Sequence, residues 1–191
     1  MWIRIVVSCA AVVCLLGMAG AVPAQEEAPQ GMPPLPKPGP EQAVMQNEAG
    51  VWDAAVEMFM TPGGAPAVSK GVETNTMGCG GMCVLGKFEG EMMGQPFVGQ
   101  SLTAYDAVKK KYVGVWMDSM SVGPSFSEAV YDPAAKTMTG TMEGPDMSGK
   151  VAKMVTRGHS KDADHRTWSM YSVGPDGKEV LGLRITYARR K

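Results

Sequence analysis

Apolar and polar residues alternate along most of the chain after residue 50, in short segments that turn residues separate. Successive side chains of a β-strand point to opposite faces, so a period of two predicts strands. We predict them over residues 51–58, 68–77, 82–90, 97–105 and 111–118, and near residues 125–131, 136–143, 150–159, 166–173 and 179–189. The last segment alternates most clearly, and one of its faces would carry Leu181, Leu183, Ile185 and Tyr187.

The connections between these segments are short and rich in turn-forming residues. Residues 105–110 (YDAVKK) are echoed by residues 131–136 (YDPAAK), and residues 174–177 (GPDG) are a third turn. The Asp in each suits a turn, because its side chain can accept hydrogen bonds from backbone amides that follow. A chain that turns back about every 8–12 residues makes antiparallel neighbours, and closing the sheet removes its edges. We therefore predict an all-β fold, an antiparallel up-and-down barrel of about ten strands.

One segment has a helical period instead. In residues 41–49 (EQAVMQNEA), Val44, Met45 and Glu48 fall at helical spacing, and Gly50 is placed to end a short N-terminal helix. The preceding residues 25–40 are typical of an extended linker. A docking motif for a partner is the alternative reading of that proline-rich stretch, which contains Pro29, Pro33, Pro34, Pro36, Pro38 and Pro40.

Residues 1–24 have the features of a secretory signal peptide. One positive charge, Arg4, precedes an apolar run over residues 5–18, and the small residues that follow suit cleavage after either Ala21 or Ala24. The run is shorter than the roughly 20 apolar residues of a membrane span. We therefore expect export to the periplasm or the exterior, no membrane insertion of the mature chain, and three parts: a signal peptide (1–24), a proline-rich linker (25–40) and a barrel domain (41–191).

Composition narrows the partners. The 191 residues carry 18 Lys and Arg against 19 Asp and Glu, a net charge of −1, which gives no electrostatic reason to bind nucleic acid or an anionic membrane. A hydrophobic content of 45% excludes wholesale disorder. The 24 Gly and 14 Pro speak against a large helical bundle. No feature identifies a protein partner.

Cys79 and Cys83 are the cysteines that remain after residue 24. In an oxidising compartment two cysteines suggest a disulfide. On an extended strand, however, their α-carbons would lie roughly 13 Å apart, and a disulfide needs about 4.4–6.8 Å. A bridge therefore requires a turn, which Gly80 and Gly81 could permit. A disulfide and two free thiols both stay open.

Metal binding and catalysis have little support in the sequence. Soft ligands such as the 17 Met favour Cu(I), but these residues do not cluster along the chain and usually fill cores. His159 and His165 flank a charged turn, where exposed histidines are common. No Gly-x-Ser-x-Gly, His-Glu-x-x-His or phosphate-binding motif is present. We expect no metal, no cofactor and no enzymatic activity.

Residues 111–118 hold the candidate ligand site. Tyr112, Trp116 and Asp118 share one face with Gly114, and the opposite face also carries large side chains, so the pattern leaves open which face looks inward. If Asp118 points into the barrel, it needs a polar partner and is a candidate for orienting a ligand. Tyr112 and Trp116 would then supply the apolar wall that small-molecule sites have.

Several fragments together resemble a secreted bacterial family of lipocalin-like barrels, the domain of unknown function 1579. They are residues 50–52 (GVW), 80–81 (GG), 94–99 (GQPFVG), 105–106 (YD), 112–120 (YVGVWMDSM) and 187–191 (YARRK). The resemblance covers about residues 41–190 and implies a lipocalin- or calycin-like fold but no reaction. The Gly-x-Trp also resembles the lipocalin signature, which implies that Trp52 closes the barrel base beside an Arg of the last strand, here Arg184 or Arg189.

These observations lead to an exported barrel that binds a small apolar molecule in its interior, since barrels of this size can hold a cavity. A structural or protein-interaction module of the cell envelope, with a barrel filled by its own Met and aromatic side chains, is the alternative. A copper-binding protein is a third hypothesis.

Overall fold

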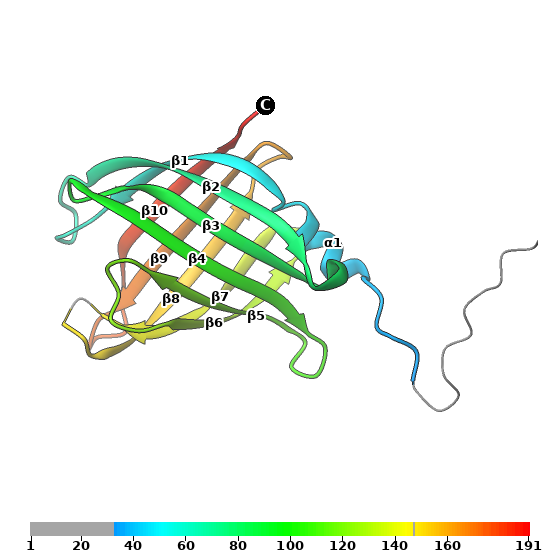
Figure 1. Ribbon diagram of the computed structural model, residues 1–191. Helices are drawn as coiled ribbons and strands as arrows, with labels where there is room; N and C mark the ends of the chain where they lie inside the picture. Colours follow the sequence, from blue (N-terminus) through cyan, green and yellow to red (C-terminus); the bar gives the residue numbers. More distant parts are fainter. Residues whose placement is uncertain (1–32, 147) are drawn as a thin grey trace, which may run out of the picture. The chain divides into compact units, whose positions relative to one another are not determined.

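The computed structural model describes residues 33–146 and 148–191 (Figure 1). The predicted signal peptide and the first part of the predicted linker lie outside the described residues. Residues 33–39 form neither helix nor strand. Among the residues described, no helix combines the length and the hydrophobicity needed to cross a bilayer.

The described chain forms a closed antiparallel barrel behind one short helix, α1 (Pro40–Gln46). Each strand pairs with its neighbours in the sequence, and the first strand pairs with the last, which confirms the predicted all-β up-and-down barrel. A single turn of 3-10 helix, η1 (Cys79–Gly81), separates the second and third strands. The strands are β1 (Gly50–Met58), β2 (Ala67–Gly78), β3 (Cys83–Met92), β4 (Gln95–Asp106), β5 (Lys111–Asp118), β6 (Ser125–Asp132), β7 (Thr137–Pro145), β8 (Val151–Ser160), β9 (His165–Val173) and β10 (Glu179–Arg189).

Alternation of side chains separates the inside of the barrel from its surface. In β1, Trp52 and Val56 are each 2% exposed, while Asp53 and Ala55 between them are exposed. Burying side chains of this size stabilises the fold by about 1.5–3 kcal/mol each. The main core cluster consists of Trp52, Ala54, Val56, Phe88, Phe97 and Tyr187, which come from β1, β3, β4 and β10.

The alternation predicted for β10 is wrong at one position. A β-bulge shifts the register between Leu181 and Leu183, so that Leu181 pairs with Tyr171 and Leu183 pairs with Met170. Tyr171 and Met170 are adjacent in β9 and face opposite sides of the sheet. Leu181 therefore lies on the other face from Leu183, because a bulge inserts an extra residue into one strand.

The two echoed turns use their aspartates in the same way. Oδ1 of Asp106 accepts hydrogen bonds from the backbone amides of Val108 and Lys109, each at 2.9 Å. Oδ1 of Asp132 accepts them from the two amides at the same offsets, those of Ala134 and Ala135. These bonds satisfy backbone donors that have no partner in the sheet, which explains why the sequence repeats the motif at both turns.

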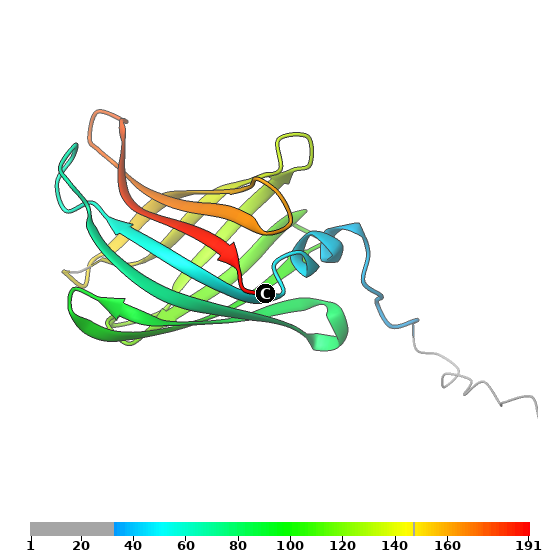
Figure 2. The ribbon, with the colours of Figure 1, turned by 90° about the horizontal axis from the view of Figure 1, so that it is seen from above.

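The two ends of the barrel differ in how they are covered. Figure 2 shows α1 lying across one end, beside the C-terminus, while hairpin turns surround the other. Met45 of α1 packs with Val84 and Tyr112 in a second core cluster. The hydroxyl of Tyr112 donates to the carbonyl of Glu41 at 3.1 Å. We call the end under α1 the closed end and the opposite end the open end.

Cys79 and Cys83 form a disulfide at the closed end, with their α-carbons 5.6 Å apart. The turn that a bridge requires is η1, in which Gly80 has a φ of 64° and Gly81 a φ of 89°. These positive φ values suit glycine, because it has no Cβ to clash. Of the two alternatives left open by the sequence, the structure contains the disulfide.

Candidate functional site

The barrel encloses a cavity of about 1090 Å³. Every strand contributes to its lining, and α1 adds Val44 and Met45 at the closed end. Large apolar and aromatic side chains predominate, and a smaller number of polar groups lies between them. Small-molecule sites have volumes of about 300–1,000 Å³ and the same apolar character. The interior is therefore not filled by its own side chains, and it has the size and lining of a ligand site.

β5 directs the predicted site residues into this cavity. Tyr112, Trp116 and Asp118 all line it, so their face of β5 looks inward, and Met117 on the opposite face is exposed. The strand separates them, however. Six residues of extended chain span about 20 Å, which places Tyr112 at the closed end and Asp118 at the open end. The structure therefore does not bring the three side chains together.

Tyr112 belongs to the closed end. It is 6% exposed, packs edge-to-face against Tyr105 at 5.2 Å, and donates its hydroxyl hydrogen bond to the backbone of α1. Burial raises the pKa of Tyr112 to about 12, and the negative charge of Glu41 adds to the effect. The phenol therefore stays protonated at neutral pH and connects β5 to the helix.

Asp118 is already engaged by its own surroundings. Its Oδ2 accepts hydrogen bonds from Trp116 Nε1 and Ser121 Oγ, both at 2.8 Å. Its Oδ1 accepts from the backbone amides of Met120 at 2.9 Å and Ser121 at 2.8 Å. A carboxylate with four donors has little capacity left for a ligand. Asp118 thus fixes the indole of Trp116 and the loop between β5 and β6.

Trp116 forms part of the cavity wall near the open end. Its ring stacks on Phe97, with centroids 6.4 Å apart and planes inclined by 21°. Gly99 lies beneath the indole, and a Cβ at that position would approach the ring to 2.2 Å. A residue larger than glycine would therefore displace Trp116 from the wall.

At the closed end, Trp52 lies close to two guanidinium groups. Arg189 lies 4.0 Å from the indole centroid and Arg166 lies 4.5 Å from it, while Trp52 Nε1 donates to the carbonyl of Glu48 at 2.9 Å. Arg189 thus occupies the place that the lipocalin resemblance implied for an Arg of the last strand. Arg184 does not. It is five residues earlier in β10 and therefore on the outer face, where it approaches Glu57 at 3.8 Å.

Sequence reasoning missed Arg166. This residue lies on the inner face of β9, its side chain is 14% exposed, and it forms ion pairs of 2.6 Å with both Glu48 and Glu73. Its guanidinium also lies 4.1 Å from the ring centroid of Tyr187. The signal in the sequence is that Arg166 shares one face of its strand with Trp168 and Met170. If these two large apolar side chains point into the barrel, the charge of Arg166 is buried with them.

Burial governs the ionisable groups around Arg166. Desolvation raises the pKa of Glu48, and the charge of Arg166 only partly opposes that effect. Burial also raises the pKa of Tyr187 well above its ordinary range, and the charge of Glu73 adds to it. The Nε of Arg166 is itself buried without a hydrogen-bond partner among the described residues. In this cluster, the positive charge of Arg166 and the negative charges of Glu48 and Glu73 therefore stabilise one another inside the barrel.

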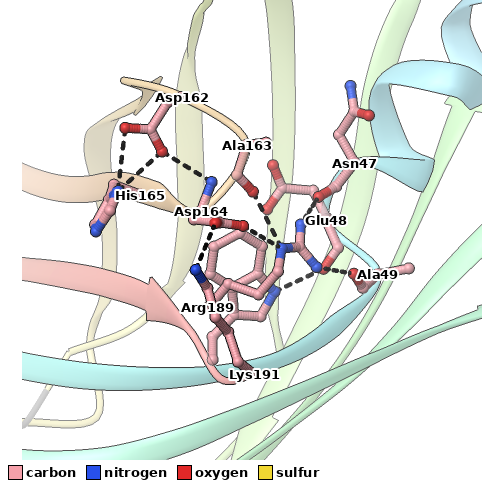
Figure 3. A network of polar contacts seen from close by, with 10 residues as sticks. Asn47, Glu48, Ala49, Asp162, Ala163, Asp164, His165, Arg189 and Lys191 are labelled. Carbon is pink, nitrogen blue, oxygen red and sulfur yellow. Dashed lines mark hydrogen bonds and ion pairs between the residues drawn. The ribbon is translucent and has the colours of Figure 1, made fainter.

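Arg189 joins the three segments that close this end, as Figure 3 shows. Its Nη1 donates to the carbonyl of Ala49 at 2.6 Å and its Nη2 to that of Asn47 at 2.8 Å. Its Nε donates to the carbonyl of Ala163 in the turn between β8 and β9. Gly50 has a φ of 129°, and a Cβ there would lie 2.5 Å from Nη1 of Arg189. The Gly-x-Trp motif is thus explained by the space that this arginine needs.

The open end is lined by methionines. The sequence shows no clustering of these residues, but the barrel gathers their side chains from five strands and three loops near this end. Met142 and Met154 are direct cross-strand partners in β7 and β8. Among the described residues, no group of three or more His, Cys, Asp or Glu is arranged to hold a metal ion. The methionines that line the cavity near this end are Met58, Met60, Met92, Met93, Met120, Met142, Met154 and Met170.

Comparisons with known proteins agree with the fold. The family described as "Protein of unknown function (DUF1579)" matches residues 37–189. Among curated protein sequences, none matches the chain significantly. The structure of Rv2717c from M. tuberculosis is similar with a TM-score of 0.58 and 11% identity, covering 80% of this chain and 99% of that one. The S-type phycobiliprotein lyase CPES from Guillardia theta is similar with a TM-score of 0.50 and 14% identity, covering 81% and 99%. At these identities the likeness concerns the barrel fold alone.

Proposed function

The chain belongs to the DUF1579 family of proteins of unknown function, and from that premise we propose that it is an exported binding protein that holds a small, mostly apolar ligand inside its barrel. The observation that carries this proposal is the interior cavity of about 1090 Å³ with its apolar and aromatic lining. Burying apolar surface contributes about 25 cal/mol per Å² to ligand binding before the costs of association. A barrel of this kind has enough uncovered inner surface for a small hydrophobic molecule.

The cavity favours binding over the alternative of a barrel packed for purely structural purposes. Protein interiors are normally close-packed, with few voids larger than a water molecule. A cavity of this size leaves much apolar lining in contact with water, which is unfavourable. An apolar ligand would cover that surface and restore packing contacts.

Binding rather than catalysis is proposed from the state of the polar groups in the lining. Asp118 holds Trp116 and a loop, and Tyr112 holds α1. Arg166 is occupied by Glu48 and Glu73. Each of these groups is engaged in fixing the fold, so none is poised as a nucleophile or a general base within this set.

Export is proposed from two independent features. The pattern of residues 1–24 is that of a secretory signal peptide. The disulfide between Cys79 and Cys83 is typical of a protein that folds in an oxidising compartment. Localisation of the tagged full-length chain in its host, with and without residues 1–24, tests this part of the proposal.

Native mass spectrometry of the protein purified from its own host is the direct test of ligand binding. We expect a species heavier than the mature chain by the mass of one small organic molecule. Thermal unfolding against a panel of lipids and small apolar molecules should also show stabilisation by those that bind, because a ligand of the folded state alone raises stability by mass action. A bare-chain mass together with no thermal shift across the panel would contradict the proposal.

A pair of substitutions distinguishes the cavity from the outer surface. Ser127 lines the cavity opposite Gly114, whereas Thr139 lies on the outer face of β7 and is exposed. Ser127→Phe should weaken ligand binding by about tenfold, since the ring occupies volume that the ligand needs. Thr139→Phe adds a similar ring outside and should leave the affinity unchanged. Equal affinities for the two variants would place the ligand elsewhere.

A further inference from the structure

The inner surface of the closed end carries a guanidinium between two carboxylates. Arg166 Nη1 lies 2.6 Å from Glu48 Oε2, and Arg166 Nη2 lies 2.6 Å from Glu73 Oε1. All three residues line the cavity. At this end the proposed ligand site thus contains one cation held between two anions, and their arrangement bears on which ligand can enter.

Both terminal nitrogens of Arg166 are already paired with protein carboxylates. An arginine that binds a ligand carboxylate offers it two parallel N–H groups, but here both terminal nitrogens already donate to protein carboxylates. The Trp52 and Tyr187 rings lie 4.5 and 4.1 Å from the guanidinium carbon. The remaining nitrogen, Nε, has no hydrogen-bond partner among the described residues, but it is fully buried and therefore not exposed to a ligand in the cavity. The place that an anionic ligand would take beside this arginine is therefore filled by the protein itself.

The second cation at the closed end is also occupied. The three nitrogens of the Arg189 guanidinium donate to the carbonyls of Ala49, Asn47 and Ala163. Two further basic residues of the lining at this end are both exposed: Lys136 in the turn between β6 and β7, and His159 near the end of β8. An incoming carboxylate would thus lose its hydration and meet two carboxylates without an unoccupied buried cation.

A group that donates hydrogen bonds meets a different surface. Within residues 33–146 and 148–191, Oε2 of Glu48 makes the ion pair with Arg166, and no hydrogen bond to Oε1 is present. The Glu48 side chain remains 33% exposed and lines the cavity, so Oε1 is an available acceptor. Desolvation by burial raises the pKa of this carboxyl. A donor placed beside Oε1 would add a hydrogen bond to the carboxylate.

We propose that the closed end of the cavity is a head-group subsite for a hydrogen-bond donor, an amine or a hydroxyl, and that Glu48 accepts from it while the pair Glu48 and Glu73 excludes carboxylates. The inference rests on the proposed function, because it names the chemical class of the ligand for the same cavity. The apolar remainder of the ligand would extend toward Trp116 and the methionines of the open end. The ligand class is thus a long-chain or ring-bearing apolar amine or alcohol, not a fatty acid.

The test compares three probes that share one alkyl chain: dodecylamine, dodecan-1-ol and dodecanoate. Each is titrated calorimetrically, below its micelle concentration, into the full-length mature chain at neutral pH. We expect the amine and the alcohol to bind at least about tenfold more tightly than the carboxylate, a difference that corresponds to about 1.4 kcal/mol. The ranking needs no variant, so it remains informative if a substitution at the closed end fails to fold.

Glu48→Gln is the variant that tests the residue. It keeps an oxygen for Arg166 and removes the negative charge. It should therefore weaken the binding of dodecylamine and strengthen the binding of dodecanoate. The ratio of the two affinities should fall by about fivefold to tenfold. Glu143→Gln makes the same change of charge on the outer face of β7 and is the matched control. The control should keep the wild-type ratio.

The possible outcomes separate this inference from the proposed function. Dodecanoate binding as tightly as the amine and the alcohol, or a wild-type ratio in Glu48→Gln, would overturn the head-group subsite while leaving a binding barrel in place. If none of the three probes binds and none of the wider lipid and small-molecule panel does, the proposed function fails and the subsite with it. The expected ranking, shifted by Glu48→Gln and not by Glu143→Gln, supports both.

Discussion

At the closed end of the barrel, Arg166 contacts two carboxylates and two aromatic rings, whereas eight methionines line the cavity near the open end. The closed end is stabilised by ion pairs, hydrogen bonds and cation–π contacts, each of which requires a specific partner in a specific geometry. The open end is lined by flexible, polarizable thioethers that can adapt to different neighbours. This difference indicates that one end sets geometry and charge while the other accommodates shape. A single substitution should therefore lower the free energy of unfolding much more at the closed end than at the open end.

The largest effect is expected from Arg166→Met. Removing the guanidinium leaves Glu48 and Glu73 inside the barrel without the cation that pairs with both, and breaking a buried pair in this way costs about 3–5 kcal/mol. Denaturant unfolding of the purified variant measures the change. Arg184→Met is the matched control, because its ion pair with Glu57 is long and exposed and should contribute at most about 1 kcal/mol. Similar losses in the two variants would remove the distinction between the inner and outer arginines.

Removal of the disulfide comes next. Cys79→Ser combined with Cys83→Ser opens a loop with a sequence separation of 4, and loop entropy for so short a ring gives about 2 kcal/mol. Neither cysteine lines the cavity, so ligand affinity should stay the same while the unfolding free energy falls. Reduction of the wild-type chain should reproduce the loss. A drop in affinity without a drop in stability would assign the bridge to the site rather than to the closed end.

Most of the fold could be predicted because it depends on local rules. Side-chain alternation gave the strands, and Asp106 and Asp132 marked two turns by hydrogen bonds that span only a few residues. The bulge that turns Leu181 outward could not be predicted, since it depends on how β10 registers against β9. The disulfide stayed open for a similar reason, because the spacing of the cysteines fits a bridge only once η1 forms.

The candidate site was predictable only in part. Alternation placed Tyr112, Trp116 and Asp118 on one face. That face extends along the whole length of the barrel, however, so Tyr112 lies at the closed end while Trp116 and Asp118 lie near the open end. Arg166 and Glu48 are 118 positions apart in sequence by their numbering, and their contact exists only after β1 and β10 close the barrel. Clusters assembled across a closed sheet leave no local pattern that would reveal them.

The pH dependence of stability should report on Glu48. Desolvation raises the pKa of this carboxyl in the folded chain above its ordinary value of 4.5, against the charges of Arg166 and Arg189 and with that of Glu73. The folded state then binds the proton more tightly than the unfolded state, so this group lowers stability as the pH rises above 4.5 and through the folded pKa. Glu48→Gln should remove that slope.

Unfolding free energies of the wild type and Glu48→Gln, measured at intervals from about pH 4 to pH 8, check this expectation. The difference between the two should move in favour of the variant as the pH rises and then level off. The outer-face control Glu143→Gln should track the wild type. A difference that is constant over the range, or that moves in favour of the wild type, would show that the Glu48 pKa is not raised.

The smallest effect is expected at the open end, from Met154→Leu. Leucine has nearly the volume of methionine, and swaps of this kind usually cost less than about 1.5 kcal/mol. Met142 is the direct cross-strand partner, so Met142→Leu and the double variant complete a cycle that measures how strongly the two side chains depend on each other. If the open end adapts as its composition suggests, the decreases in unfolding free energy of the two single variants should add up to that of the double variant, because each flexible neighbour can repack around the change. A large coupling energy between Met142 and Met154 would instead mean that the open end is packed as specifically as the cluster around Arg166.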